Sequence, residues 1–336
     1  MVPIIKVTLR LRKMYWVLLG IGLAAITALG LSLMSGGRII ALDYQDFPKD
    51  ELEKLIMPEP HQVELGMSGP LEAQASSWLT WWAMKLMPGT FLVDVRLNGY
   101  KASLAVDTGA PRSFLSPQLT VAAQVSLTSS QLTIDFGVNG RKVPIYMGYA
   151  QELELGNLRI QNLPVIVAGN QPVIKLLGLP VWKVDGLLGM EPLRRFALTL
   201  DYERGIVILR REPVPPRGDS ALLQIVSLKT VPGIESLELT RPIVEGFVNS
   251  QGPYPCFIDT GTSAPVAVPP EIWQALGLEG QKQARLEIRL GELQLKGVPA
   301  VRAKVGQIII GSNIFQTQGF KRLTLDFLAG KLYAER

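Results

Sequence analysis

Beyond residue 89, short apolar runs alternate with turn-forming residues, a pattern typical of β-strands. No strong amphipathic helix longer than about ten residues is evident there. The pair Asn98-Gly99 joins two alternating runs and favours a type I′ hairpin. Short helices are expected at 270–278 and 174–179, and a longer hairpin turn at 249–253. The pattern therefore predicts an all-β fold for this part of the chain.

Three blocks of this β-rich part occur twice, in the same order. Residues 91–117 match 242–270, residues 155–165 match 290–300, and residues 185–209 match 308–333. The Pro-rich stretch 212–217 separates the two copies. We therefore expect two homologous lobes, at 90–211 and 219–336.

The first copy is the longer one, since Gly156 lies 49 positions after Asp107 whereas Gly291 lies 32 positions after Asp259. The extra residues are predicted to form a hairpin around 131–149, with Gly137 and Gly140 at its tip. This hairpin is either a flap that closes over a substrate or an ordinary hairpin packed on its own lobe.

The N-terminal region has a different pattern. Residues 14–34 form an apolar run without charge, and four positive residues precede it. As a helix this run would be about 31 Å long, close to the thickness of a bilayer core. We expect a transmembrane signal anchor at 14–34, with residues 1–13 as a basic cytoplasmic N-terminus and the rest extracytoplasmic. The predicted location is thus the plasma (inner) membrane, in a single pass. A signal peptide cleaved near 28–30 stays the alternative.

Residues 35–89 are expected to form an acidic linker, with a short helix near 49–56. Trp78, Trp81 and Trp82 follow at helical spacing and predict a Trp-rich helix at 76–87. This helix either packs on the globular part or rests on the outer leaflet of the membrane, where Trp is favoured.

Composition narrows the chemistry. The chain carries 34 Lys+Arg against 29 Asp+Glu, a net charge of +5, and four of the positive residues lie in 1–13. The rest is close to neutral, so no nucleic-acid partner is expected. One His and one Cys exclude a Ser-His-Asp triad, a Cys-His dyad, a clustered zinc site and an intramolecular disulfide. Cys256 is expected to be a small buried hydrophobe. No metal or cofactor is expected, and catalysis would rest on carboxylates, Lys, Tyr or hydroxyls.

Each copy of the first repeated block ends in an Asp-Thr-Gly triplet, at 107–109 and 259–261. Both triplets follow an apolar run typical of a strand buried on both faces. An Asx-type turn would explain one copy. It does not explain an acid at the end of both apolar strands, because burying a carboxylate is costly unless it is paired or hydrogen-bonded. Asp107 and Asp259 are therefore predicted to be catalytic.

At these residues the sequence resembles the aspartic proteases, both the two-lobed pepsin-like group and the retroviral (retropepsin-like) homodimeric group. The resemblance covers roughly 90–336. The segment DTGTS at 259–263 is similar to the pepsin-type second motif, and DTGA at 107–110 to the retroviral motif. Gly189 and Gly311 end segments that resemble the family's apolar-apolar-Gly segment, which packs behind the catalytic loop.

The resemblance implies two β-barrel lobes with a cleft between them, one catalytic Asp from each. Thr108 and Thr260 would cross-link the two loops by hydrogen bonds. Gly109 and Gly261 would allow a close backbone approach that a side chain would block.

Two carboxyls about 3 Å apart cannot easily both ionise, so they would share one proton and activate a water. The leading hypothesis is a membrane-anchored aspartic endopeptidase, active as a monomer on a peptide or protein substrate. A catalytically silent peptide-binding module of the same fold and a structural envelope protein are the alternatives. Thr262 offers a hydroxyl where Ala110 offers none. We therefore expect Asp259 to be the more acidic carboxyl and Asp107 to keep its proton to higher pH.

Overall fold

The computed structural model of the chain describes residues 40–45, 47–55, 63–73, 90–128, 132–136, 141–176, 179–228, 239–262 and 264–336. The predicted anchor at 14–34, the Trp-rich segment at 76–87 and the hairpin tip at 137–140 lie outside them. No helix within the described ranges is long and apolar enough to cross a membrane. The helices in these ranges have only four to six residues, and strands form the rest of the framework, as the all-β prediction requires.

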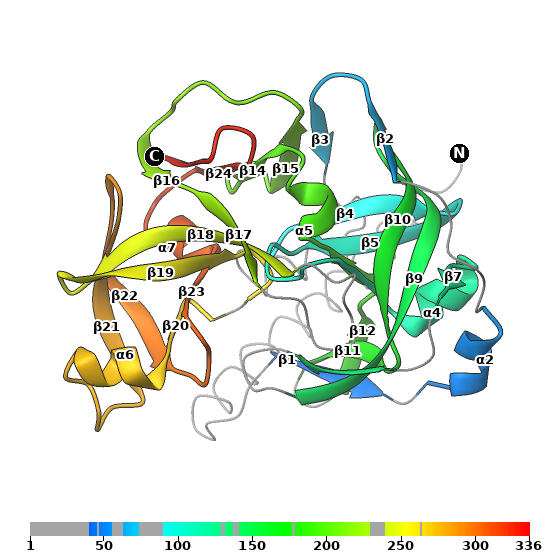
Figure 1. Cartoon of the computed structure of the whole chain (residues 1–336), viewed down its shortest axis with the longest axis horizontal. Coiled ribbons are helices and arrows are strands. Elements are labelled where there is room, and N and C mark those ends of the chain that lie inside the picture. The colour runs from blue at the N-terminus through cyan, green and yellow to red at the C-terminus, as the bar shows by residue number, and fades with distance from the viewer. Residues whose placement is uncertain are drawn as a thin grey trace, which may run out of the picture. The chain divides into compact units, whose positions relative to one another are not determined.

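Six strands close into a first barrel (Figure 1): β4 (Leu92–Leu97), β5 (Tyr100–Val106), β6 (Ser113–Leu115), β9 (Arg141–Leu155), β10 (Leu158–Ala168) and β13 (Gly186–Leu188). Their order is β10-β6-β13-β5-β4-β9, and the pairing of β9 with β10 closes the ring. Three further strands pair at its margin: β2 (Glu64–Met67), β7 (Ser126–Leu127) and β8 (Leu132–Phe136). Helix α4 (Pro117–Ala122) follows β6, and α5 (Met190–Leu193) follows β13.

A second barrel repeats this plan with β18 (Leu239–Val248), β19 (Gln251–Asp259), β20 (Val266–Val268), β21 (Gln283–Leu290), β22 (Leu293–Arg302) and β23 (Ile308–Gly311). Their order is β22-β20-β23-β19-β18-β21, and the pairing of β21 with β22 closes the ring. Strand β17 (Gln224–Leu228) pairs with β18, helix α6 (Pro270–Ala275) follows β20 and α7 (Asn313–Thr317) follows β23. Strand for strand this order matches the first barrel, which supports the two homologous lobes read from the repeat.

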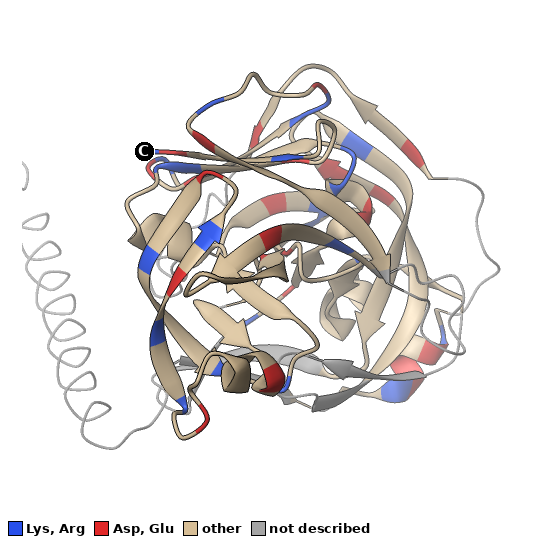
Figure 2. Ribbon diagram, turned by 60° about the vertical axis from the view of Figure 1, so that its left-hand side comes forward, with Lys and Arg blue, Asp and Glu red and all other residues tan. Residues whose placement is uncertain are grey.

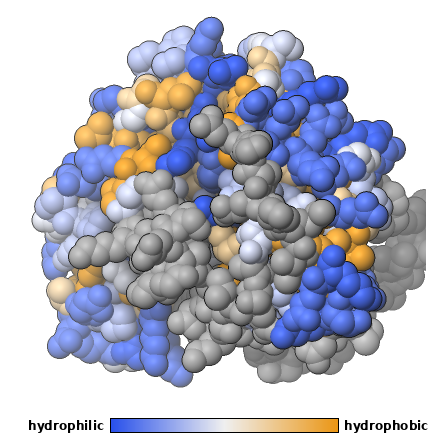
Figure 3. Space-filling model, turned by 45° about the vertical axis from the view of Figure 1, so that its right-hand side comes forward, coloured by the Kyte–Doolittle hydropathy of each residue, from blue (hydrophilic) through white to orange (hydrophobic). Residues whose placement is uncertain are grey.

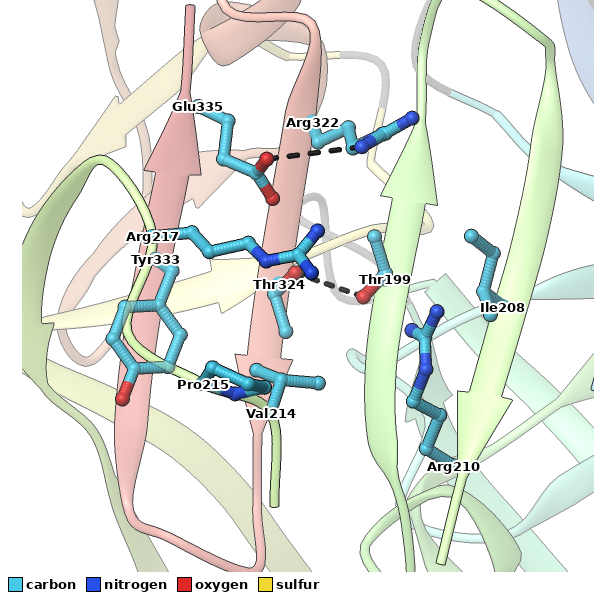
Figure 4. Close-up of a pocket in the computed structure, with 10 residues that line it drawn as sticks. All are labelled: Thr199, Ile208, Arg210, Val214, Pro215, Arg217, Arg322, Thr324, Tyr333 and Glu335. Atoms are coloured by element: carbon cyan, nitrogen blue, oxygen red, sulfur yellow. Dashed lines mark hydrogen bonds and ion pairs between the residues drawn. The ribbon is translucent and has the colours of Figure 1, made fainter. Parts of the chain in front are cut away.

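One sheet joins the two lobes (Figure 1). It contains β3 (Leu71–Ala73), β14 (Ala197–Asp201), β15 (Ile206–Arg210), β16 (Asp219–Leu222), β24 (Arg322–Asp326) and β25 (Lys331–Glu335), in the order β16-β25-β24-β14-β15-β3. Strands β14 and β24 pair antiparallel at its middle, with Thr199 opposite Thr324. In Figure 4 the two threonine hydroxyls are hydrogen-bonded, at 2.8 Å, and Arg322 forms an ion pair with Glu335, at 3.7 Å. The lobes are therefore connected by a continuous backbone ladder.

The segment predicted to be an acidic linker is partly built into this framework. Helix α2 (Lys49–Glu53) confirms the short helix expected near 49–56, and its Leu52 is fully buried. Strands β2 and β3 pair with β10 and β15. The cause is an alternation of apolar and polar residues in 63–73, which suits half-buried strands better than a solvated spacer.

A separate compact unit contains β1 (Ile40–Gln45), β11 (Gln171–Leu176) and β12 (Leu179–Lys183), which form a three-stranded sheet. The short helix expected at 174–179 is therefore wrong, because this segment runs from one strand of a hairpin into the other. Pro172 and Pro180 flank the run, and Val and Ile within it favour strands over helix.

Two hairpin turns test the turn predictions. Asn98 and Gly99 have φ of 48° and 81°, so the expected type I′ turn is confirmed. The longer turn expected at 249–253 is wrong, because β18 and β19 are joined by two residues, Asn249 and Ser250. Their φ values are 47° and 68°. The second lobe thus keeps the two-residue turn of the first although no glycine occupies it.

The interior of both barrels is apolar. Cys256 lies in it, fully buried and free, as predicted. Charged residues of both signs are interspersed along the strands in Figure 2. On the face drawn in Figure 3, apolar groups reach the surface in separate places among hydrophilic ones. Burial of the apolar interior thus fixes the barrels, and the barrels in turn fix the turns at their strand ends.

Candidate active site

The two Asp-Thr-Gly turns lie at equivalent strand ends. Asp107 follows β5, which pairs in parallel with β13, and Asp259 ends β19, which pairs in parallel with β23. The N–H of Asp107 donates to the carbonyl of Leu188 at 2.9 Å. The carbonyl of Asp259 accepts the N–H of Ser312 at 3.0 Å. The backbone of each aspartate is therefore held by the strand beside it.

Gly189 and Gly311 lie directly behind these turns. A Cβ at Gly189 would lie 2.2 Å from the carbonyl oxygen of Arg112, and one at Gly311 would lie 2.4 Å from that of Ala264. Real Cβ atoms do not approach backbone so closely, so both positions require glycine. This geometry agrees with the packing expected of the two apolar-apolar-Gly segments.

Thr108 and Thr260 cross-link the two turns by four reciprocal hydrogen bonds. The hydroxyl of Thr108 donates to the carbonyl of Ile258 at 2.7 Å and accepts the N–H of Thr260 at 3.1 Å. The hydroxyl of Thr260 donates to the carbonyl of Val106 at 2.8 Å and accepts the N–H of Thr108 at 2.9 Å. Both threonines are buried, so these bonds are shielded from water and fix the two turns against each other.

The glycine of each turn lies against the carboxyl of the other lobe. A Cβ on Gly109 would be 2.6 Å from an oxygen of Asp259, and a Cβ on Gly261 would be 2.2 Å from the carboxyl carbon of Asp107. The absence of a side chain at these two positions therefore lets the two carboxyls approach each other. The two carboxyls are close enough for each to shift the pKa of the other.

Backbone N–H groups also bind the two carboxyls. Gly109 donates to Oδ1 of Asp107 at 2.7 Å, and Gly261 donates to Oδ1 of Asp259 at 2.8 Å. The N–H of Thr262 adds a second donor to the same Asp259 oxygen, at 3.2 Å. Asp107 is only 8% exposed, whereas Asp259 is more open to solvent.

Burial is the main influence on both carboxyls and raises the pKa of each. The negative charge of Asp259 raises the pKa of Asp107 further. Backbone N–H groups oppose the rise in pKa on both sides, from Gly109 and Ala110 for Asp107 and from Gly261 and Thr262 for Asp259. The positive charge of Arg241 opposes it for Asp259. Asp107 is therefore the carboxyl that keeps its proton to higher pH, in the order expected from the sequence.

The cause of that order differs from the one expected. The hydroxyl of Thr262 accepts the N–H of Ala264 at 3.2 Å, and the contact with Asp259 comes from the Thr262 backbone instead. Ala110 is buried and its carbonyl accepts the N–H of Met190 at 2.8 Å. The asymmetry between the carboxyls thus does not require the hydroxyl of Thr262.

Arg241 and Tyr202 were missed in the sequence. Arg241 lies close enough to Asp259 for its charge to lower the pKa of that carboxyl. Tyr202 donates its hydroxyl to the carbonyl of Ser312 at 2.7 Å, and Ser312 in turn binds the backbone of Asp259. Aligning the two hairpins on their aspartates would have drawn attention to Arg241, because the first lobe has Thr90 at that position.

The hairpin predicted around 131–149 is formed by β8 and β9, whose register runs from Leu132 opposite Ile145 to Phe136 opposite Arg141. Its tip, with Gly137 and Gly140, lies outside the described residues. Flap and ordinary hairpin therefore stay alternative predictions. Within the described part of the chain, no group of three or more His, Cys, Asp or Glu side chains is placed to hold a metal ion.

The family profile described as aspartyl protease matches residues 93–191. This match covers the first lobe from β4 to the start of α5 and includes the turn at Asp107. Among solved structures, the chain is similar to a retropepsin-like aspartic protease from Rickettsia conorii, at 18% identity and a TM-score of 0.25. That match covers 44% of this chain and 92% of the other. The family match alone bears on function, and it shows that residues 93–191 of the first lobe are similar to aspartyl proteases.

Proposed function

We propose that the chain is an aspartic endopeptidase whose two catalytic carboxyls, Asp107 and Asp259, come from the two lobes of a single polypeptide. The observation that carries this proposal is the paired arrangement of the Asp-Thr-Gly turns. The glycine of each turn lies against the carboxyl of the other lobe, and the threonine cross-link holds the two turns together. The similarity of residues 93–191 to aspartyl proteases supports the same reaction class.

In the proposed reaction the two carboxyls share one proton. Asp259, which has a nearby cation and is more open to solvent, is ionised and takes a proton from a bound water. Asp107 carries the shared proton and donates a hydrogen bond to the scissile carbonyl oxygen. The water oxygen attacks the carbonyl carbon as the proton of Asp107 passes to the carbonyl oxygen, which gives a tetrahedral diol. The C–N bond then breaks as the proton held by Asp259 passes to the amide nitrogen. A diol hydroxyl returns its proton to Asp107, so the dyad regains its starting charge.

Since both carboxyls belong to one chain, we propose a monomeric active unit that binds an extended peptide or protein segment across the two turns. We also propose that residues 14–34 anchor it in the plasma (inner) membrane, with the lobes on the extracytoplasmic side. The anchor is tested by washing membranes that contain the full chain at alkaline pH. If residues 14–34 span the membrane, the chain should stay in the membrane pellet.

Cleavage of a peptide library by the full chain in detergent tests the activity. We expect internal peptide bonds to be cut, and pepstatin to block the cutting. Asp107→Asn and Asp259→Asn should each abolish cleavage while the chain stays folded, because each carboxyl has a separate proton role. Full turnover by either variant would rule out the dyad. Tight peptide binding without any cleavage by the wild type would favour the silent binding module instead.

A further inference from the structure

Arg241 lies at a defined place beside the dyad. Strands β18 and β19 pair antiparallel, with Ile243 opposite Phe257. Continuing this register by two residues brings Arg241 opposite Asp259. The guanidinium carbon of Arg241 lies 5.2 Å from the centre of the Phe257 ring, which is two residues before Asp259 and on the same face of its strand. The ring therefore holds the cation at the end of the strand that carries the catalytic carboxyl.

The cation is partly withdrawn from water and, among the described residues, forms no direct ion pair, although it feels the charge of Asp259. Burial lowers the pKa of Arg241, and the negative charge of Asp259 opposes this. No carboxylate of the described residues lies within ion-pair distance of its guanidinium, and no described residue is hydrogen-bonded to it. Arginine keeps its charge even when it is partly buried. A partly desolvated cation that forms no direct ion pair is stabilised when a carboxylate binds to it.

The first lobe has no such charge. There β4 pairs with β5 with Leu92 opposite Ala105, and the same two-residue continuation brings Thr90 opposite Asp107. The two sides of the dyad therefore differ by one positive charge. A peptide bound across the dyad has a direction, so Arg241 faces the residues on only one side of the scissile bond.

We propose that Arg241 is a specificity-determining residue that binds the carboxylate of an Asp or Glu side chain on one side of the scissile bond. This inference rests on the proposed function. The planar guanidinium matches a carboxylate with two parallel N–H···O bonds, and the flat Phe257 ring limits its orientations. The substrates preferred by this site are therefore peptides with an acidic residue close to the cleaved bond. Lys or Arg at the same substrate position is disfavoured by charge repulsion.

The test uses matched peptides built on a sequence that the full chain cleaves in the library. Each position flanking the cleaved bond carries Glu, Gln or Lys in turn, and kcat/KM is measured for each peptide. At one position, on one side of the cleaved bond, we expect the Glu peptide to have a kcat/KM about tenfold or more above that of the Gln peptide. The reason is that hydrogen bonds between charged groups are stronger than those to neutral groups. The Lys peptide should have a lower kcat/KM than the Gln peptide at that position.

Variants of Arg241 separate substrate recognition from a general effect on the dyad. Arg241→Gln should reduce the ratio of kcat/KM for the Glu peptide to kcat/KM for the Gln peptide to about one. Arg241→Lys should keep part of this preference. The ratio is the informative quantity, because a change in the dyad alone lowers both peptides equally. Arg289→Gln is the matched control. Like Arg241, Arg289 lies over a phenylalanine ring: its guanidinium carbon is 4.2 Å from the centre of the Phe247 ring in β18, away from the dyad. Loss of Arg289 should therefore leave the ratio of kcat/KM for Glu and Gln peptides unchanged.

An unchanged ratio of Glu to Gln peptides in Arg241→Gln overturns the inference, as does a wild type without acidic preference at any flanking position. Lower thermal stability of Arg241→Gln with the ratio intact would mean that a carboxylate of the chain itself pairs with Arg241, and also overturns it. Binding of the same peptides to Asp107→Asn, measured by fluorescence anisotropy, tests selectivity without turnover. If Asp107→Asn binds the Glu peptides more tightly than the Gln peptides but the wild type cleaves none of them, the proposed activity is contradicted and the role of Arg241 is supported.

Discussion

Thr199 and Thr324 are equivalent residues of the repeat, and their hydroxyl oxygens lie 2.8 Å apart in the middle of the sheet that joins the lobes. Both stand in the sequence Leu-Thr-Leu-Asp, once in β14 and once in β24. On either side of them Leu198 pairs with Leu325 and Leu200 with Leu323. The ladder is therefore symmetric about the threonine pair. The same approximate two-fold relation holds at the active site, where Thr108 and Thr260 exchange hydrogen bonds.

Gly261→Ala should damage the active site directly. The added Cβ would lie 2.2 Å from the carboxyl carbon of Asp107, so that carboxyl must move. A displacement of about 1 Å in catalytic geometry costs about a hundredfold in rate, and we expect a loss of that order in kcat/KM. Gly280→Ala is the matched control, since nothing lies within 4 Å of its added Cβ. Equal activity of the two variants would contradict the close approach.

Thr108→Val should destabilise the cross-link. It leaves the carbonyl of Ile258 and the N–H of Thr260 without their hydroxyl partner. Each buried group left unsatisfied costs about 1–3 kcal/mol, so we expect the free energy of unfolding to fall by about 2–4 kcal/mol. Denaturant titration measures this loss, and Thr108→Ser, which keeps the hydroxyl, should recover most of the stability. A Val variant as stable as the wild type would show that the hydroxyl bonds contribute nothing.

The raised pKa of Asp107 predicts how stability depends on pH. In the unfolded chain an Asp has a pKa of about 3.9, whereas burial raises that of Asp107 in the folded protein. Between these values the folded protein holds a proton that the unfolded chain has lost. The free energy of unfolding therefore falls as pH rises from about 4 through the folded pKa. Asp107→Asn, which mimics the neutral carboxyl, should flatten this decline. An identical slope in both proteins would mean that Asp107 ionises freely when folded.

Ala110→Ser tests the donors around the first-lobe carboxyl. The activity profile of the wild type should be bell-shaped, with an alkaline limb set by loss of the shared proton. A serine hydroxyl at 110 that donates to Asp107 would favour its charged form and lower the dyad's upper pKa. We expect the alkaline limb to move to lower pH by about one unit, since one unit corresponds to about 1.4 kcal/mol. A limb that stays in place or moves upward speaks against this hydrogen bond.

Local and repeated features of the sequence predict most of this structure. The two Asp-Thr-Gly turns follow from an acid at the end of an apolar strand that occurs twice, and the Asn98-Gly99 hairpin follows from turn chemistry alone. The helix expected at 174–179 failed because a short apolar run has no clear period, and pairing in a sheet decided its structure. Asn249-Ser250 was missed because the hairpin register, which depends on long-range pairing, selects the turn.

Arg241 was missed for a related reason. It lies 18 residues before Asp259, and nothing in its local sequence marks it as part of a site. Only the β18–β19 register, and the stacking on Phe257, bring its charge to the catalytic carboxyl. Burial and charge around a titratable group depend on strands distant in sequence. A motif therefore identifies the reactive carboxyls but not the neighbouring residues that give them different pKa values.

The sheet that joins the lobes also has a consequence for biosynthesis. β14 ends at Asp201, but its partner β24 begins at Arg322, about 120 residues later. Ribosomes add about 5–20 residues per second, so β14 waits roughly 6–24 s for its partner. During that time its edge is a free template for another strand. Because β14 and β24 share the sequence Leu-Thr-Leu-Asp, the β14 of a neighbouring nascent chain offers nearly the same ladder. Crowded polysomes therefore favour pairing between first lobes of different chains, before the second lobe emerges to displace it.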